Sequence, residues 1–600
     1  MPSSFFGMDI ASTALSAAQT LMDVAGQNIA NDATPGYSQQ VANLVATPPY
    51  AQPDMGGLYT PQLGTGVEVQ SVTRVRANYL DGIYRTTQSD ESYYSTRTNY
   101  LQALQSVLNE PGSNGLSASM NTFFSSYQTL SQNPQSSAAR TVVQQDGEAL
   151  AAQVQQIYQG LQSVGVQAQS QAGLDAQTVN SDLQQLANLN TTISQAQAIG
   201  QQPNDLLDQR DNLLDSLSKL ININFSTQTS TVGSFVTSQV TVTMPTSSGS
   251  SVTLVSGGQY GSLQVQPTTT SQASYASDTT ALGLTAQTDT INGVTIAVTA
   301  TDTLQSLASK INAANAGVTA TVVPNGSQYQ LTLTSNSSQP ITGSGSDLFG
   351  TTAQGLAIPV GTPQFVANAT DALTGTTSSV APSGGSIGAA YSLVNTDLNP
   401  NPPSGSAPTL MSQFTSAVLG LMNDINTVQM QGVYPVYSGS STTPTSWSAG
   451  VPFFVSPTNT TGTLTAQDIP SVEVNPAIQN DINQITTTST QAQDTGGPNL
   501  GDGWNATQMA DVAQQQGGPV SQYSAFVADM GAAVDLSQNL QSTSQSLLTQ
   551  VTSQREQTAG VSINEQMTNL VQAQSMYTAA AKVAEAMDSS LQSLLSAIQP

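Results

Sequence analysis

The sequence contains no cysteine and no histidine. Their absence rules out the Ser-His-Asp and Cys-His arrangements of hydrolases. It also rules out thiolate and imidazole ligands for zinc or haem. Without cysteine there is no disulfide framework, so the redox compartment cannot be read from the sequence. Whole classes of enzyme are therefore excluded from the outset.

Positive charge is also scarce. The 600 residues include 10 lysines and arginines against 36 aspartates and glutamates, which gives a formal net charge of −26. Between residues 311 and 554 there is no basic residue at all. Proteins bind nucleic acids through clustered Lys and Arg side chains, so we expect no nucleic-acid partner.

Long hydrophobic runs are missing as well. No stretch of about 18 apolar residues occurs, so we expect no transmembrane helix. The N-terminus lacks a basic region followed by an apolar core, so we expect no Sec-type signal peptide. Residues 1–36 carry aspartates and no basic residue, whereas a helix on a membrane surface needs Lys and Arg on its polar face. We therefore expect a partner helix here, and no membrane partner.

Both ends of the chain have the pattern of a long helix. In residues 5–32 and 563–598, small and apolar side chains recur at alternating spacings of four and three, which is typical of a coiled-coil seam. Each helix could pack on the body as an ordinary amphipathic helix, or the two could pair with one another. The predicted seam residues are Ile10, Ala14, Ala17, Leu21, Val24 and Asn28 in the first helix, and Met567, Leu570, Gln574, Tyr577, Ala581, Ala584, Leu591, Leu595 and Ile598 in the second.

The interior changes from helical to β composition and back. Residues 77–220 are rich in Gln, Ala and Leu, with helix breaks expected at Pro111, Pro134 and Pro203. Residues 222–408 are rich in Thr, Ser, Val and Gly, which favours strands. Helical patterns return after residue 409.

One helix interrupts the β-rich region. It carries the apolar face Leu304, Leu307 and Ile311, and strands are predicted on both sides of it. We interpret this stretch as a compact β-α-β-β unit.

These patterns predict an α+β multidomain fold with nested domains. We expect long N- and C-terminal helices that pair as a coiled-coil-like inner domain, a helical bundle body, and outer β-rich domains inserted in the middle of the chain. The predicted domains are a terminal helical assembly domain (residues 1–36 with 561–600), a mainly helical body (37–222 with 409–560), a β-rich domain (223–268 with 370–408) and an outer inserted β-α-β-β domain (269–369).

Candidate catalytic motifs are weak. Residues 384–388 match the G-x-S-x-G pattern, but the hydrolase triad needs a histidine, so we interpret them as a turn. Asp208, Asp211 and Asp215 share one helix face, which is either a metal site or a solvated acidic face with Asp215 paired to Lys219 on the outside. We favour the solvated face. We expect no catalytic residue, no metal, no cofactor and no enzymatic activity.

Two terminal motifs resemble those of bacterial flagellar axial proteins, which include rod, hook and hook-associated proteins. Residues 11–37 read ASTALSAAQTLMDVAGQNIANDATPGY, and residues 560–577 read GVSINEQMTNLVQAQSMY. Each motif lies at the end of the chain where that family carries it. The resemblance implies that the two terminal helices pair.

Internal stretches resemble the hook-associated protein 1 family in particular. They are residues 204–218 (NDLLDQRDNLLDSLS), 501–511 (GDGWNATQMAD), and 451–454 (VPFF) with 469–476 (IPSVEVNP). Residues 291–335 resemble the repeat of flagellins and of the filament cap protein, so the outer domain is expected to be of flagellin-repeat type.

The resemblance implies a structural subunit of the hook-filament junction. It further implies an extracellular place in the flagellum, reached through the flagellar type III export system without a cleaved signal peptide. The implied partners are the flagellar hook protein, hook-associated protein 3, other copies of the chain and a flagellar export chaperone. The alternatives are another axial role (hook, distal rod or filament subunit) and a surface adhesin.

Assembly is expected to proceed through the terminal helices. A narrow Ala- and Gln-rich seam buries little surface, so these segments are expected to become ordered only on docking between neighbours. The alternative is that the seam residues form an intramolecular core and nothing more. The residues that we expect at the assembly interface are Leu15, Leu21, Val24, Ile29, Leu570, Tyr577, Leu591 and Leu595.

Overall fold

The computed structural model gives the fold of most of the chain. The residues that it describes are 6–51, 62–233, 235–247, 249–271, 273–325, 327–337, 341–350, 355–358, 364–400, 407–438, 443–489 and 498–598.

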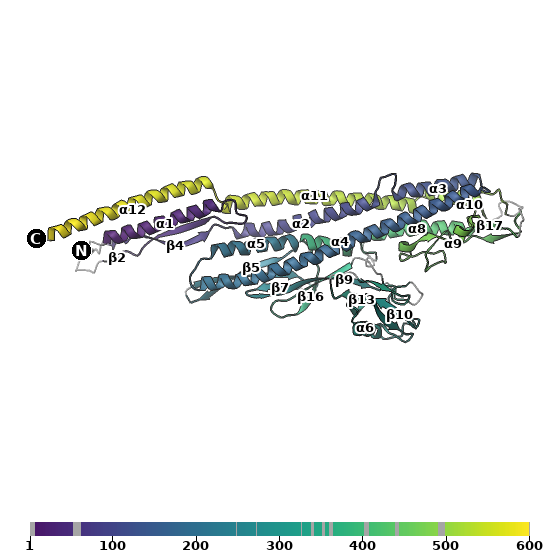
Figure 1. The fold of residues 1–600 in the computed structure, drawn as a ribbon, viewed down its shortest axis with the longest axis horizontal. Coiled ribbons are helices and arrows are strands. Elements are labelled where there is room, and N and C mark those ends of the chain that lie inside the picture. Colours follow the sequence, from purple (N-terminus) through teal and green to yellow (C-terminus); the bar gives the residue numbers. More distant parts are fainter. Residues whose placement is uncertain are drawn as a thin grey trace.

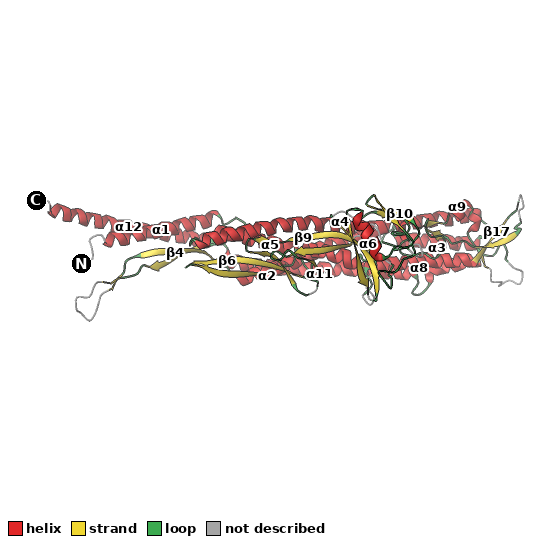
Figure 2. Cartoon of the chain, turned by 90° about the horizontal axis from the view of Figure 1, so that it is seen from below, coloured by secondary structure: helices red, strands yellow, loops and turns green. Residues whose placement is uncertain are grey.

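The helices account for most of the long axis of the molecule (Figures 1 and 2). They are α1 Phe6–Ala30, α2 Asn78–Leu108, α3 Leu116–Gln132, α4 Ser137–Ala198, α5 Asn204–Leu220, α6 Leu304–Ala313, α7 Gly385–Ser392, α8 Leu410–Gln431, α9 Pro476–Asn480, α10 Trp504–Asp511, α11 Pro519–Ala559 and α12 Ile563–Ile598, with the short η1 Leu393–Asp397, η2 Ile469–Ser471, η3 Ile482–Gln484 and η4 Val512–Gln514.

The strands form several small sheets. They are β1 Gln40–Ala46, β2 Tyr50–Ala51, β3 Gln62–Leu63, β4 Val67–Arg74, β5 Asn224–Val232, β6 Phe235–Pro245, β7 Ser251–Ser256, β8 Gln259–Tyr260, β9 Ser262–Thr270, β10 Gln287–Ile291, β11 Val294–Val298, β12 Val318–Asn325, β13 Gln328–Ser335, β14 Gly343–Ser344, β15 Gln364–Thr370, β16 Thr377–Val380, β17 Gly432–Val436, β18 Ser446–Ala449, β19 Phe454–Val455, β20 Glu473–Val474 and β21 Thr488–Ser489.

The two terminal helices lie side by side at one end of the elongated molecule (Figure 1). The antiparallel ribbon of β1 and β4 packs along α1. From there α2 and α11 run together along the long axis, and α4 lies beside them (Figure 1). The predicted α+β multidomain fold, with paired terminal helices, is confirmed.

Local sequence signals account for the helix boundaries. The predicted breaks fall between α2 and α3, between α3 and α4, and between α4 and α5. The Ser136 side chain caps α4 by accepting a hydrogen bond from the Ala139 amide. At the start of α8, Thr409 and Ser412 form a reciprocal capping box.

The β-rich region holds two larger antiparallel sheets. One is a meander in the order β5-β6-β7-β8, and α4 packs against β6. The other has the order β12-β13-β9-β15-β16. The predicted β-α-β-β unit is present as β10, β11, α6, β12 and β13. Strands β10 and β11 form a separate sheet with β14.

Among the residues that the structure describes, buried apolar side chains form two separate cores. The larger core extends from α2, α3 and α4 to α8, α11 and the inner β sheets. The smaller core lies within the β-α-β-β unit and its flanking loops, and includes Leu307, Ile311 and Leu331. The division into four domains stays a prediction, and β9 pairs both with β13 of the unit and with β15 outside it.

The separate cores predict local unfolding of the outer unit. Ile311→Ala should cost about 2–5 kcal/mol because it leaves a cavity in the smaller core. Amide protection in β12 and β13, measured by hydrogen exchange, should fall while that of α4 stays unchanged. The matched variant Leu217→Ala, in the larger core, should give the opposite pattern. Equal loss of protection in α4 and β12 in either variant would show that the cores unfold as one.

Candidate assembly site

Alanines make up most of the fully buried side chains of the terminal helices. The buried side chains of α1 are Ala11, Ala17, Ala18, Ala25 and Asn28. The buried side chains among the described part of α12 are Gln566, Ala573 and Ala580. Small side chains let the helices approach closely but bury little apolar surface, so the pair gains little stability from the seam.

The predicted seam of α12 is offset by one residue. We expected Met567, Gln574 and Ala581 on it, but Met567 and Gln574 are exposed and Ala581 is half-buried. The structure instead buries Gln566, Ala573 and Ala580, each one position earlier. Hydrophobicity favoured Met567 over its neighbour Gln566, whose amide is buried because it makes a specific hydrogen bond.

That bond belongs to a polar cluster at the base of the helix pair, which we call the Asn28 cluster: Asn28, Tyr37, Gln40 and Gln566. The fully buried Asn28 amide donates to Gln566 Oε1 at 3.0 Å and to the Gln40 carbonyl at 2.9 Å. Its Oδ1 accepts from the Gln40 amide at 2.9 Å and from the Tyr37 hydroxyl at 2.8 Å. Four segments of the chain thus meet at one side chain.

The stretch between α1 and β1 connects this cluster to the body. The Ser38 amide and hydroxyl donate to Asp208 of α5 at 3.1 and 2.7 Å. The next amide, that of Gln39, donates to the carbonyl of Ala559, at the end of α11. The helix pair is therefore held by α5 and α11 together.

Asn204 does not cap α5. The N-cap position is Pro203, and Asn204 is the first residue of the helix. The Asn204 amide donates instead to Gln40 Oε1 at 3.2 Å and to the Val72 carbonyl at 2.9 Å. The Asn204 side chain therefore bonds to tertiary partners on β1 and β4, whereas an N-cap would have accepted a backbone amide of α5 through its oxygen.

Next to the cluster lies a buried network of ion pairs, which we call the arginine ladder. Its members alternate in sign and come from β4, the segment after it, α2, α5 and α11. They are Arg74, Arg76, Arg85 and Arg555 with Asp81, Asp208, Asp211 and Asp215.

The aspartates of α5 form one side of the ladder. Arg74 Nη1 lies 2.6 Å from Asp208 and 2.9 Å from Asp211. Arg85 of α2 lies 3.1 Å from Asp211 through Nη2 and 2.7 Å from Asp215 through Nε. Each of these arginines thus bridges two carboxylates one helical turn apart.

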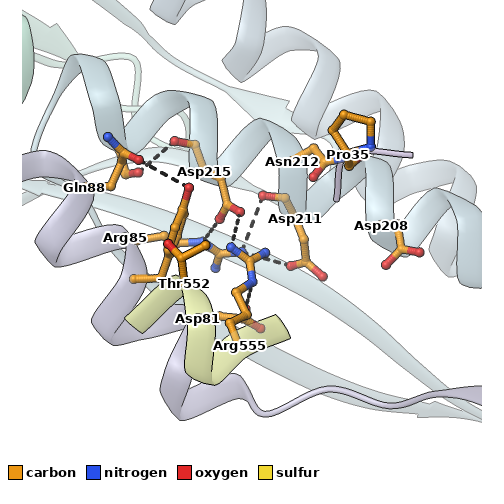
Figure 3. A network of polar contacts seen from close by, with 12 residues as sticks. Pro35, Asp81, Arg85, Gln88, Asp208, Asp211, Asn212, Asp215, Thr552 and Arg555 are labelled. Carbon is orange, nitrogen blue, oxygen red and sulfur yellow. Dashed lines mark hydrogen bonds and ion pairs between the residues drawn. The ribbon is translucent and has the colours of Figure 1, made fainter. Parts of the chain in front are cut away.

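Arg555 ties α11 into the ladder. Its Nε lies 3.0 Å from Asp81 and its Nη1 lies 2.7 Å from Asp215. Figure 3 shows Arg555 of α11 and Arg85 of α2 both reaching Asp215 of α5. Arg76 completes the network with a two-point contact to Asp81 at 2.9 and 3.0 Å.

The ladder overturns the predicted solvated acidic face. Asp208, Asp211 and Asp215 do share one face of α5, but that face is buried against β4 and α2. Asp215 pairs with Arg85 and Arg555 and not with Lys219. Asp215 does not pair with the nearby Lys219 because Arg85 and Arg555 occupy its carboxylate. Both arginines come from elements more than one hundred residues away in the chain.

Pairing of opposite charges shifts the pKa values of Asp211 and Arg76 in the ladder. Burial alone raises the pKa of Asp211, but Arg76, Arg74 and Arg85 outweigh it and lower this pKa to about 2. Burial lowers the pKa of Arg76, and the facing Asp211 and Asp81 outweigh that effect and raise it. Asp211 is thus held firmly as the anion at the centre of the ladder.

Arg210 lies away from these carboxylates. Its Nη1 donates to the Ser238 carbonyl at 3.4 Å, and its buried Nε has no hydrogen-bond partner. Burial lowers the pKa of Arg210 to about 10, Asp211 opposes that shift, and the like charges of Arg74 and Arg85 add to it.

Sequence reasoning missed Arg74, Arg76, Arg85 and Arg555 as members of the site. A usable signal was present, because three of the ten basic residues fall within residues 74–85. In a chain this acidic, such a cluster has to face carboxylates, and residues 205–215 are the densest acidic stretch of the helical region.

A cleft of about 440 Å³ lies beside the ladder. Its walls come from the turn after α1 and from α2, α5 and α11, and include Pro35, Tyr84, Asn212, Lys219 and Glu556. Gly36, with φ +77°, lets the turn press against Asn212, where a Cβ atom would lie 1.8 Å from Oδ1.

The predicted assembly residues fall into two groups. Six of them are half-buried in the helix pair: Leu15, Leu21, Val24, Ile29, Leu570 and Leu591. Tyr577 and Leu595 of α12 are 42% and 62% exposed. Their role in assembly stays a prediction, but these two side chains have the exposed surface that a neighbouring chain needs.

The described part of the chain gives little support for a metal site, a membrane-spanning helix or a nucleophile turn. Within it, no cluster of three or more Asp or Glu side chains is arranged to hold a metal ion. None of the described helices combines the length and apolarity needed to cross a bilayer. Gly384 and Gly385 of the G-x-S-x-G match form the start of helix α7 where we expected only a turn.

Two family models match the chain. Residues 101–322 match the helical domain of the flagellar hook-associated protein FlgK. Residues 552–597, which include Arg555 and nearly all of α12, match the C-terminal region of the flagellar basal body rod proteins FlgEFG.

Individual proteins are also similar. Flagellar hook-associated protein 1 of Bacillus subtilis is 37% identical over 227 residues, which cover 38% of this chain and 45% of that protein. The protein of the same name from Salmonella typhimurium is 32% identical over 220 residues, covering 36% and 38%. The matched region thus spans less than half the length of these relatives.

A solved structure of the flagellar hook junction protein FlgK from Burkholderia pseudomallei covers 80% of this chain and 100% of its own. The sequence identity is 13% and the TM-score is 0.47.

The ladder predicts loss of stability in acid. The pKa of Asp211 is about 2 in the folded chain against an ordinary value of 3.8, so its stabilisation is complete above about pH 4 and disappears as the pH falls toward 2. This amounts to about 2 kcal/mol of unfolding free energy, measurable by urea titration at a series of pH values.

The variant Asp211→Asn should unfold about 3 kcal/mol more easily at pH 7, because it leaves buried guanidinium groups without a partner. It should also depend less on pH than the parent chain does. Asp23→Asn, at an exposed position of α1, is the matched control and should change neither property. An unchanged pH dependence in Asp211→Asn would contradict the assignment.

Proposed function

Because this chain belongs to the family of flagellar hook-associated protein 1, we propose that it is a structural subunit of the bacterial flagellum that forms the junction between hook and filament. The match to the FlgK helical domain supports this role through the body of the molecule. The match to the rod proteins supports an axial position through α12. We propose a mechanical role without catalysis.

The paired terminal helices are the observation that carries the proposal. They extend from one end of the body, and their fully buried side chains are alanines together with the bonded pair Asn28 and Gln566. The Asn28 cluster and the arginine ladder fix the base of the pair on α2, α5 and α11. A subunit built in this way can transmit force between its terminal helices and its body.

Assembly through these helices follows from their weak seam. Buried alanines add little apolar area, so the pair is stabilised further when neighbouring subunits cover its outer faces. We propose that the helices become fully ordered on docking. The contacts are made by Leu15, Leu21, Val24, Ile29, Leu570, Tyr577, Leu591 and Leu595.

The partners follow from the position in the flagellum. We propose contacts with the hook protein on one side, with hook-associated protein 3 on the other, and with other copies of the chain around the axis. Export through the flagellar type III system, with the help of an export chaperone, places the chain outside the cell.

A second axial role is supported by one observation. The match of residues 552–597 is to rod proteins, so a distal rod, hook or filament position is the alternative. Labelled subunits would then appear along a length of the axial structure. A junction protein would appear only in one short zone.

Removing residues 1–32 tests the proposal. The deletion takes away α1 and the Asn28 cluster but leaves both apolar cores, so the remaining body should be soluble and folded. Such a chain should no longer join the hook when it replaces the full protein in cells, as seen by electron microscopy of labelled subunits. Normal incorporation of the truncated chain would defeat the proposal.

Leu595→Ser tests the exposed end of α12. Because this side chain is 62% exposed, the unfolding free energy should change by no more than about 0.5 kcal/mol. Incorporation at the junction should nevertheless fall sharply. Leu536→Ser, at a side chain on α11 that is 60% exposed, is the matched control and should assemble normally. Equal incorporation of both variants would remove Leu595 from the interface.

A further inference from the structure

Two contacts near opposite ends of the helix pair define its register. Asn28 of α1 bonds to Gln566 of α12, and Gly7 lies against Met587, whose Cγ atom is 3.3 Å from the Cβ position at Gly7. Both contacts describe one antiparallel register, in which residue n of α1 lies opposite residue 594 − n of α12.

The alanine seam does not by itself select this register. Ala11, Ala18 and Ala25 recur every seven residues in α1, and Ala573 and Ala580 have the same spacing in α12. A slide of α1 by seven residues, about 10 Å, would again place Ala580 between two alanines of α1, Ala18 and Ala25. The slid state would therefore keep part of the apolar packing of the observed state.

The connection to the body would permit such a slide. Residues 31–39 join α1 to β1 and are folded into turns. Nine residues can reach about 30 Å when extended. The segment therefore holds enough spare length for α1 to move outward along α12.

The Asn28 cluster exists only in the observed register. A slide would separate Asn28 from Gln566, from Gln40 and from Tyr37, and would break four hydrogen bonds. The remaining buried residues of the two seams are alanines. A single buried polar residue in an apolar seam is known to fix the register of coiled coils at some expense of stability.

The side chain of Gln566 lowers the stability of the helix pair in this way. Its Oε1 accepts from Asn28, but its Nε2 is buried and has no hydrogen-bond partner. An unsatisfied buried donor costs about 1–3 kcal/mol, so an apolar side chain would serve stability better at this position. The amide is explained if its task is to recognise Asn28.

We propose that Asn28, recognised by Gln566, is a positioning residue that locks α1 in one register on α12. The consequence for assembly rests on the proposed function. In the observed register, the described part of α1 begins opposite position 588, and Leu595 lies beyond it. In the slid register, Phe6 would lie opposite Leu595 and would cover it. The lock thus keeps the assembly end of α12 free.

The absence of cysteine from the chain makes the register directly measurable. Gly7→Cys with Met587→Cys reports the observed register, because the two positions are in contact. Ala14→Cys with Met587→Cys reports the slid register, since these positions are about 10 Å apart in the observed one and cannot form a disulfide there. Each pair is oxidised mildly in the dilute full-length chain, and intramolecular disulfides are counted by mass spectrometry.

In the unaltered background only the pair at 7 and 587 should close. Asn28→Ala should raise disulfide formation between positions 14 and 587 by about tenfold or more, because several hydrogen bonds that oppose the slide are lost. Gln566→Met should have a smaller effect in the same direction. The matched controls are Asn31→Ala, whose side chain makes only local contacts, and Gln574→Met at an exposed position. Both controls should behave as the unaltered chain.

Two outcomes would overturn the proposal. If Asn28→Ala still closes only the pair at 7 and 587, the ribbon of β1 and β4, the connecting segments or the alanines set the register. If it closes neither pair while circular dichroism shows a folded body, the cluster holds the helices together without selecting a register. Neither readout involves the flagellum, so the register can be wrong while the junction role is right, and the reverse.

Discussion

The structure depends on the pairing of a few positive charges with buried carboxylates at one place in the body. The chain has 10 basic residues, and four arginines meet four aspartates where β4, α2, α5 and α11 converge. Removing one partner of such a network leaves a buried charge, which costs far more than a surface pair contributes. The ladder therefore fixes how these elements lie relative to one another. Ser38 and Gln39, which lie between the cluster residues Tyr37 and Gln40, bond to α5 and to the end of α11 and so fix the terminal helices on them.

The rigid base contrasts with the weak seam above it. Ion pairs and hydrogen bonds converge at the base of the helix pair, whereas the fully buried side chains further out are alanines. A helix pair of this kind gains from a neighbour that covers its exposed apolar side chains, including Tyr577 and Leu595. The helix pair is thus held firmly to the body at its base and has exposed apolar side chains toward its far end. Both features suit a subunit that is held by its terminal helices in an assembly.

Patterns local in the chain allowed much of the fold to be predicted. The terminal helices, the three proline breaks and the β-α-β-β unit follow from periodicity, composition and breakers, which act over a few residues. The order from helical to β and back to helical predicted that the two ends meet, and they do. Asn28 and Tyr37 both lie within the N-terminal motif, residues 11–37, and the structure joins their side chains.

The site itself depends on contacts that no local pattern encodes. Arg85 pairs with Asp215, 130 residues away, and Arg555 pairs with Asp81 across most of the chain, so the acidic face of α5 was wrongly interpreted as solvated. The seam of α12 was placed one residue late because hydrophobicity favours Met567, whereas a hydrogen bond to Asn28 decides for Gln566. Asn204 is of a residue type that favours the N-cap position, but its side chain bonds to β1 and β4 and does not cap its own helix. In each case a specific tertiary partner outweighed a local preference.

The most direct test of the central claim is a clean deletion of this chain in its source bacterium, with electron microscopy of the cell surface and an assay of flagellin in the medium. The account predicts bare hooks, with flagellin shed into the medium because filaments have no junction on which to grow. Filaments of normal number and length on the deletion strain would contradict it.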